Sequence, residues 1–136
     1  QAEPRVDPTR LAAIGYCFGG ATIMQMVYGG APVKGVVSFH GSLPLPPSSL
    51  PIRNSAKIFI AHGGDDPFLA PDHIAKFTAA LNAAGLDWQM VIYGGAQHSF
   101  TNPWADQYGM KGVQYQAKAD QRSWEHMQLF FDELFR

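Results

Sequence analysis

The sequence predicts an α/β fold: a mostly parallel sheet with flanking helices. Four short apolar runs rich in β-branched residues each end in glycine, and helical patterns lie between or after them. The apolar residues in these runs are continuous rather than alternating, which is typical of strands buried on both faces. Strands that alternate with helices favour parallel pairing with right-handed crossovers. The predicted strands cover residues 10–16, 33–41, 57–64 and 88–95.

Three segments have the pattern of helices. Residues 20–30 follow the first strand directly. Residues 71–85 begin with proline, which suits a first helical turn, and end at glycine. Residues 121–135 carry apolar side chains three or four apart, so we expect an amphipathic terminal helix packed on the sheet. Residues 41–56 hold four prolines and four serines, which predicts an irregular loop in place of a crossover helix.

Length and composition bound the class of protein. The chain has 136 residues, of which 46% are hydrophobic and 15% charged, as in a globular domain and unlike a disordered one. A net charge of −1 gives no basic surface for nucleic acid or anionic lipid, and no apolar run approaches the length of a membrane span. One cysteine cannot form an internal disulfide, which favours a reducing compartment such as the cytoplasm. We expect a single domain over residues 11–136, with residues 1–10 as a linker or truncated start.

The only cysteine, Cys17, lies between the first predicted strand and the following helix, in the motif Gly-Tyr-Cys-Phe-Gly. A nucleophile on such a turn needs small neighbours, because side chains at Gly15 and Gly19 would collide with the crossing strand and helix. The start of a helix stabilises an anion, so the thiol pKa is expected to fall. The backbone N–H of Phe18 would face the oxyanion of acyl transfer. The alternative is a structural cysteine that fills a gap in the core.

Two further loops follow predicted strands. Asp66 follows the third strand and could orient a histidine, or it could cap a turn, and Asp65 is a rival carboxylate. His98 follows the fourth strand, where an imidazole could reach over the edge of the sheet or remain a surface group. The order nucleophile, acid, histidine at successive strand ends is that of α/β-hydrolases, which favours the catalytic interpretation of all three.

The remaining histidines carry weaker signals. His40 and His62 end strands and are expected to pack or support the site, whereas His73 and His126 lie on predicted helices. None of them has the short pairwise spacing of a zinc site, so the sequence predicts no metal.

The motifs "RLAAIGYCFGG", "AHGGDDPF" and "GGAQHSFTNP" resemble the dienelactone hydrolase family of α/β-hydrolases. The resemblance implies that Cys17 is the nucleophile, Asp66 the acid and His98 the base of a triad. It implies hydrolysis of esters or lactones through a thioester, without metal or cofactor. Family members carry a long segment before the matching stretch, so the chain resembles their carboxyl-terminal half, a partial α/β-hydrolase fold without its first strands. Asn102 stands where dienelactone-binding members have arginine, so a neutral ester is as plausible a substrate.

Three further expectations complete the picture. Four aromatic residues lie in or beside the functional loops and could line an apolar pocket or belong to the core: Phe39, Phe68, Phe100 and Trp104. Without the first strands, residues 11–15 would form an open apolar edge, which favours a homodimer or larger oligomer. The alternative to an active hydrolase is a catalytically silent, oligomerising fragment of one, and a weaker alternative is a redox-sensing thiol.

Overall fold

Four parallel strands form one sheet in the computed structural model, which describes residues 3, 5–47, 52 and 54–136. The strands lie in chain order, β1 (Ala12–Tyr16), β2 (Gly35–Phe39), β3 (Lys57–Gly63) and β4 (Trp88–Tyr93). Every residue of β2 is buried, and so is every residue of β3 after Lys57. Their apolar residues therefore run continuously without alternating. The predicted α/β fold is therefore confirmed.

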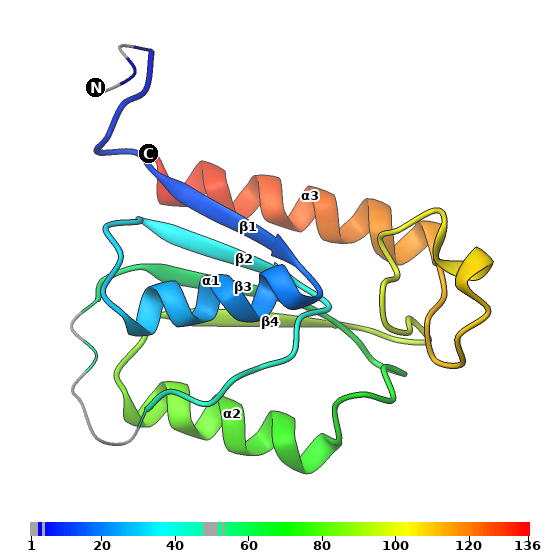
Figure 1. Ribbon diagram of the computed structural model, residues 1–136. Coiled ribbons are helices and arrows are strands. Elements are labelled where there is room, and N and C mark those ends of the chain that lie inside the picture. The colour runs from blue at the N-terminus through cyan, green and yellow to red at the C-terminus, as the bar shows by residue number, and fades with distance from the viewer. Residues whose placement is uncertain (1–2, 4, 48–51, 53) are drawn as a thin grey trace.

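Helices cover both faces of this sheet (Figure 1). Helices α1 (Phe18–Tyr28) and α2 (Pro71–Ala83) lie on one face, and α3 (Ala117–Leu134) lies on the other. A short 3₁₀-helix, η1 (Ala105–Tyr108), precedes α3 and has no counterpart in the prediction. The sequence patterns placed the start of α1 two residues too late and that of α3 four residues too late.

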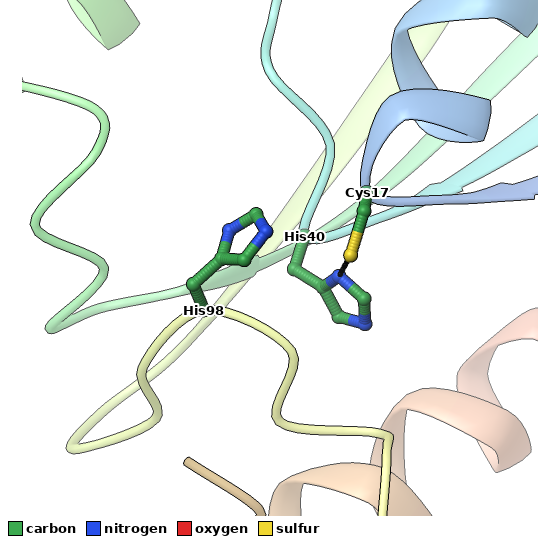
Figure 2. A group of neighbouring side chains, drawn as sticks. All are labelled: Cys17, His40 and His98. Atoms are coloured by element: carbon green, nitrogen blue, oxygen red, sulfur yellow. Dashed lines mark hydrogen bonds between the residues drawn. The ribbon is translucent and has the colours of Figure 1, made fainter. Parts of the chain in front are cut away.

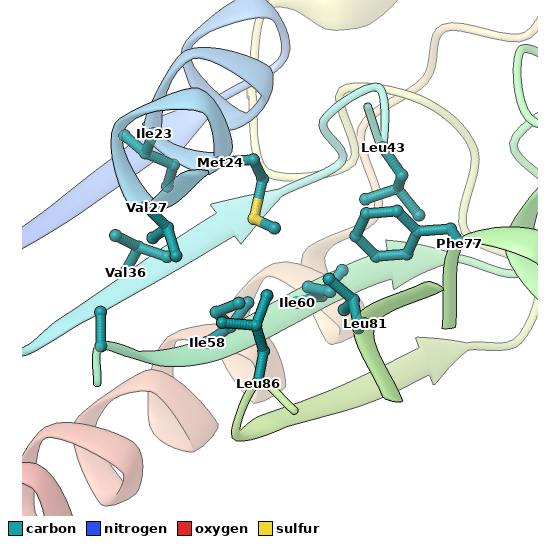
Figure 3. Packing of buried hydrophobic residues seen from close by; sticks show 11 residues of the cluster. Ile23, Met24, Val27, Val36, Leu43, Ile58, Ile60, Phe77, Leu81 and Leu86 are labelled. Atoms are coloured by element: carbon teal, nitrogen blue, oxygen red, sulfur yellow. The ribbon is translucent and has the colours of Figure 1, made fainter. Parts of the chain in front are cut away.

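The helices divide the buried apolar residues into two clusters. Side chains of α1 and α2 pack against one face of β2 and β3 (Figure 3), and these residues are Ile23, Met24, Val27, Val36, Leu43, Ala56, Ile58, Ile60, Phe77, Leu81 and Leu86. Side chains of α3 pack against the other face, in a cluster of Val37, Phe39, Phe59, Ala61, Tyr93, Ala96, Phe100, Ala119, Met127 and Phe130. A sheet held between two such clusters is a rigid support for the loops at its ends.

The proline-rich segment between β2 and β3 has no helix or strand in its described part, residues 41–47, 52 and 54–56. This agrees with the predicted loop, whose residues 48–51 and 53 lie outside the described residues. Hydrogen bonds fix its two ends, because the Tyr28 hydroxyl donates to the Pro44 carbonyl and Asn54 donates to the Val27 carbonyl. Pro44 and Asn54, near the two ends of the loop, thus lie against the carboxyl half of α1.

Strand β1 forms one edge of the sheet and is the more exposed of its parallel pair with β2. Ile14 and Tyr16 are 42% and 43% exposed, although a parallel sheet usually buries such side chains. The described residues before β1 are mostly exposed, and Arg10 donates a hydrogen bond to the Phe135 carbonyl at the opposite end of the chain. Within the described ranges, no helix has both the length and the apolarity needed to cross a bilayer.

Candidate active site

The carboxyl ends of the four strands bring their polar side chains together. Cys17 follows β1, His40 follows β2, Asp66 lies beyond β3, and the loop after β4 contributes His98 and Ser99. Parallel strands end at the same edge of a sheet, so residues far apart in the sequence become neighbours there.

The turn that carries Cys17 has an unusual backbone. Cys17 precedes α1 with φ 50° and ψ −118°, and its N–H donates to the Phe39 carbonyl on the neighbouring strand. A Cβ at Gly15 would overlap the carbonyl group of Gly19, so a side chain is excluded at Gly15. A Cβ at Gly19 would meet nothing within 4 Å. The expected steric requirement therefore exists at Gly15, and the expectation for Gly19 was wrong because that position of α1 faces open space.

The Cys17 sulfur lies between two imidazoles (Figure 2). His40 Nδ1 is 3.3 Å from Sγ, and the Ser99 hydroxyl is 3.4 Å from it. The ring of His98 lies near them, and the ligand atoms of Cys17, His40 and His98 all lie within 4.8 Å of one another. The space between Cys17 and His98 is thus short enough for a proton to pass after a small side-chain movement.

Backbone strain is concentrated around this sulfur. Of the residues that the structure describes, three other than glycine have positive φ, and these are Cys17 (50°), His40 (38°) and Ser99 (61°). The side chains of His40 and Ser99 both contact the Cys17 sulfur. Residues other than glycine rarely adopt a positive φ, and such backbone strain tends to cluster at functional sites. The strained positions therefore point to the same place as the motifs.

His98 is held by a buried carboxylate. Its Nδ1 is 2.9 Å from Asp66 Oδ2, and the Phe68 N–H donates to Oδ1 of the same carboxylate, whose side chain is 1% exposed. Burial acts to raise the pKa of Asp66, but the hydrogen bonds from His98 and Phe68 outweigh it and the pKa is lowered. The hydrogen bond to Asp66, followed by the contact with Cys17, raises the pKa of His98 to about 9. The geometry thus favours a charged imidazole beside the sulfur.

The environment of Cys17 favours the thiolate. Hydrogen bonding from His40, then from His98, lowers the pKa of Cys17 to about 5 despite its partial burial. The sulfur also lies at the start of α1, where the N–H groups of the first turn have no partner within the helix. A thiol with this pKa is almost fully ionised at pH 7, so the resting sulfur is a thiolate.

His40 has a larger part in the site than its sequence position indicated. Its side chain is 2% exposed, its Nδ1 contacts the Cys17 sulfur, and its Nε2 lies 2.7 Å from Thr101 Oγ1. The strand register explains this contact, because Tyr16 on β1 pairs with Phe39 on β2. The residues that follow this pair, Cys17 and His40, are therefore neighbours. The sequence does not show that β1 and β2 are adjacent, so this contact was missed.

A pocket of about 530 Å³ opens beside the sulfur. It is lined by Tyr16, Cys17, His40, Ser99, Thr101, Asn102, Pro103, Trp104, Asp120 and Trp124. Trp104 lines it as expected, but Phe39 and Phe100 are 1% and 0% exposed and belong to the core cluster on the α3 side. Those two pocket assignments are corrected, because both rings pack in the apolar cluster between the sheet and α3. Phe68 instead packs edge-on against His98, with ring centroids 5.2 Å apart.

The other histidines lie outside this contact group. His62 is buried, its Nδ1 has no hydrogen-bond partner among the described residues, and burial lowers its pKa. His73 Nε2 is 2.7 Å from the Leu43 carbonyl, and His126 Nδ1 is 2.9 Å from the Tyr93 hydroxyl. These three rings support the packing around the sheet.

Comparison with known proteins adds independent findings. The model of the dienelactone hydrolase family matches residues 1–135. An uncharacterized Caenorhabditis elegans protein is 32% identical, over 99% of this chain and 87% of its own length. A Yersinia pestis protein named "Putative carboxymethylenebutenolidase" is 26% identical, over 93% of this chain and 48% of its own.

A solved structure, a dienelactone hydrolase-like promiscuous phosphotriesterase from metagenomic libraries, is 39% identical with a TM-score of 0.92. The match covers 99% of this chain and 56% of the chain in that structure. The chain thus spans about half the length of this structure and of the bacterial relative, and most of the nematode protein.

Proposed function

The chain belongs to the dienelactone hydrolase family, and from this premise we propose that it hydrolyses carboxylic esters or lactones with Cys17 as the nucleophile. The observation that carries the proposal is the position of the sulfur, at the start of α1 and between two imidazoles, one of them paired with Asp66. Relatives from Yersinia pestis and Saccharolobus solfataricus, each named "Putative carboxymethylenebutenolidase", support the same class of reaction.

In the proposed reaction the Cys17 thiolate attacks the carbonyl carbon and forms a carbon–sulfur bond, which moves an electron pair onto the carbonyl oxygen. The N–H of Phe18, at the start of α1, is proposed to stabilise that oxyanion. When the tetrahedral intermediate collapses, the bond to the alcohol oxygen breaks and protonated His98 gives its proton to the leaving alkoxide. Neutral His98 then removes a proton from water, which attacks the thioester and releases the acid and the thiolate.

Asp66 and His40 have different parts in this scheme. Asp66 fixes the tautomer of His98 and stabilises its charged form. The Nδ1–H of His40 donates to the thiolate, and its Nε2 accepts from the Thr101 hydroxyl. We therefore treat His40 as a positioning residue that holds the resting sulfur.

The pocket favours a neutral substrate. Among its described lining residues the charged side chain is a carboxylate, Asp120, and there is no lysine or arginine. Asn102, at the position expected to hold a substrate carboxylate in dienelactone-binding members, uses its side chain within its own loop and contacts the Tyr108 hydroxyl and the Trp104 N–H. A substrate carboxylate would thus meet the Asp120 carboxylate without a lysine or arginine to bind it, so we propose neutral esters or lactones in place of dienelactone itself.

The test measures turnover and thiol reactivity on the same protein. We expect 4-nitrophenyl acetate hydrolysis that falls by at least about 10³-fold in Cys17→Ser, and iodoacetamide alkylation with a midpoint near pH 5. A neutral aryl phosphotriester is the second compound to test as a substrate, because the metagenomic relative is described as a promiscuous phosphotriesterase. Turnover that survives Cys17→Ser contradicts the proposal. Absent turnover with an alkylation midpoint near pH 5 supports the catalytically silent alternative.

We also propose that copies of the chain pair through β1, whose edge carries the exposed Ile14 and Tyr16. Open strand edges recruit other chains. Sedimentation equilibrium is expected to show a dimer or larger oligomer that dissociates in Ile14→Lys. A folded monomer at high concentration removes this idea. The single cysteine fits a reducing compartment, so the cytoplasm remains the proposed location.

A further inference from the structure

Cys17, His40 and His98 present one sulfur and two nitrogen donors to a common point at the strand ends. Their ligand atoms all lie within 4.8 Å of one another, and the shortest measured pair, Sγ to His40 Nδ1, is 3.3 Å apart. In a tetrahedral zinc site, with Zn–S near 2.3 Å and Zn–N near 2.0–2.1 Å, ligand atoms lie about 3.3–3.6 Å apart. Small side-chain rotations therefore bring the three atoms to zinc-binding distances.

The second nitrogen of each imidazole is already anchored. His98 Nδ1 is bound to the Asp66 carboxylate, which leaves Nε2 for a metal. His40 Nε2 is bound to the Thr101 hydroxyl, which leaves Nδ1. Such outer partners orient metal-binding histidines and raise their basicity. A hydroxyl can donate or accept, so Thr101 serves either tautomer of His40.

The site also has an entry path and an open fourth position. Cys17 and His40 line the pocket of about 530 Å³, so a hydrated ion can reach the sulfur from solvent. Water from the pocket can complete the coordination, because three protein ligands leave one tetrahedral position free. Thiolate and imidazole donors favour Zn²⁺ over Mg²⁺ and Ca²⁺, which are bound mainly by carboxylate and carbonyl oxygens.

We propose that Cys17, His40 and His98 form a Zn²⁺ site that coincides with the nucleophile, so that bound zinc reversibly inhibits the enzyme. The ion displaces the proton of His98 Nε2, which is released to solvent, and binds that nitrogen and a sulfur lone pair, the two groups that the proposed reaction uses. The inference rests on the arrangement of ligand atoms and not on turnover, so a catalytically silent chain binds zinc equally well.

The test titrates the chelator-treated 136-residue chain with Zn²⁺ in competition with a chromophoric chelator. We expect one equivalent to bind, and the affinity to fall at least tenfold in Cys17→Ser and in His40→Asn. His126→Asn is the matched control, because His126 contacts Tyr93 outside this group and its loss is expected to leave zinc affinity unchanged.

Co²⁺ supplies a spectroscopic readout on the unchanged protein. A thiolate-to-cobalt charge-transfer band in the near ultraviolet, with the intense visible bands of a tetrahedral ion, is the expected result. Where the protein turns over ester, zinc inhibits it and a chelator restores the rate. Zinc affinity that is equal in the wild type, Cys17→Ser and His40→Asn overturns the proposal, and so does a cobalt spectrum without the charge-transfer band. The cobalt spectrum decides the matter if His40→Asn fails to fold.

Discussion

The two imidazoles beside the Cys17 sulfur are held by different partners. His98 is bound to the carboxylate of Asp66, in a part-buried pair with a distance of 2.9 Å. His40 is bound to the uncharged hydroxyl of Thr101, at 2.7 Å. A carboxylate stabilises the charged imidazole, whereas a hydroxyl mainly fixes the orientation of the ring. Two similar rings at one sulfur thus have different surroundings, which suits the proposed roles: one ring carries a proton and the other holds the sulfur.

The largest effect is expected from Asp66→Asn, which removes the charged partner from one side. The pKa of His98 should fall from about 9 toward its ordinary value of 6.5. In the proposed reaction protonated His98 releases the alcohol, and the protonated form predominates only below the pKa of His98. The alkaline limb of kcat/KM should thus move to lower pH, and kcat should fall on the order of 10²- to 10⁴-fold.

Asp65→Asn is the matched control for this change, because Asp65 is the neighbouring carboxylate and is exposed. Its pH–rate profile should match that of the wild type. An equal loss in the two variants would mean that the pairing of His98 with Asp66 does not govern the reaction.

A second pair of variants tests the turn that holds the sulfur beside both imidazoles. Gly15→Ala places a Cβ against the Gly19 carbonyl, and we expect the free energy of unfolding to fall by about 1–3 kcal/mol. Gly19→Ala meets open space within a helix, so it should leave that free energy unchanged or raise it by about 0.5–1 kcal/mol. Urea denaturation measures both. Equal destabilisation would show that the turn does not depend on the close approach at Gly15.

The smallest effect is expected on the hydroxyl-bound side. His40→Phe keeps a ring in the buried space but removes the donor to Sγ, so the pKa of Cys17 should rise from about 5 by about one to two units. Iodoacetamide alkylation at pH 6 should slow by about two- to tenfold, because less thiolate is present. His40→Asn, which retains an N–H donor, should restore part of the rate. An unchanged alkylation midpoint in His40→Phe would assign the low pKa to His98 and the helix instead.

Local patterns in the sequence determined much of this protein. Continuous apolar runs predicted the four strands of the sheet, and the alternation of strands with helices predicted parallel pairing. Both patterns can be recognised from residues that lie close together in the chain. The motif around Cys17, Asp66 after the third strand and His98 after the fourth predicted residues that the fold brings to one edge. The resemblance to the family rested on the same motifs, and the family assignment is confirmed.

Only the tertiary structure decided what surrounds the sulfur. His40 contacts Sγ because β2 is the neighbour of β1, and Phe39 on β2 and Phe100 in the loop after β4 turn into the core cluster on the α3 side. Gly19 is free of steric demand for a similar reason, since a side chain there would point into open space, whereas one at Gly15 would meet the Gly19 carbonyl. Contacts between residues distant in sequence follow from strand order and the direction of each side chain, and a linear pattern records neither.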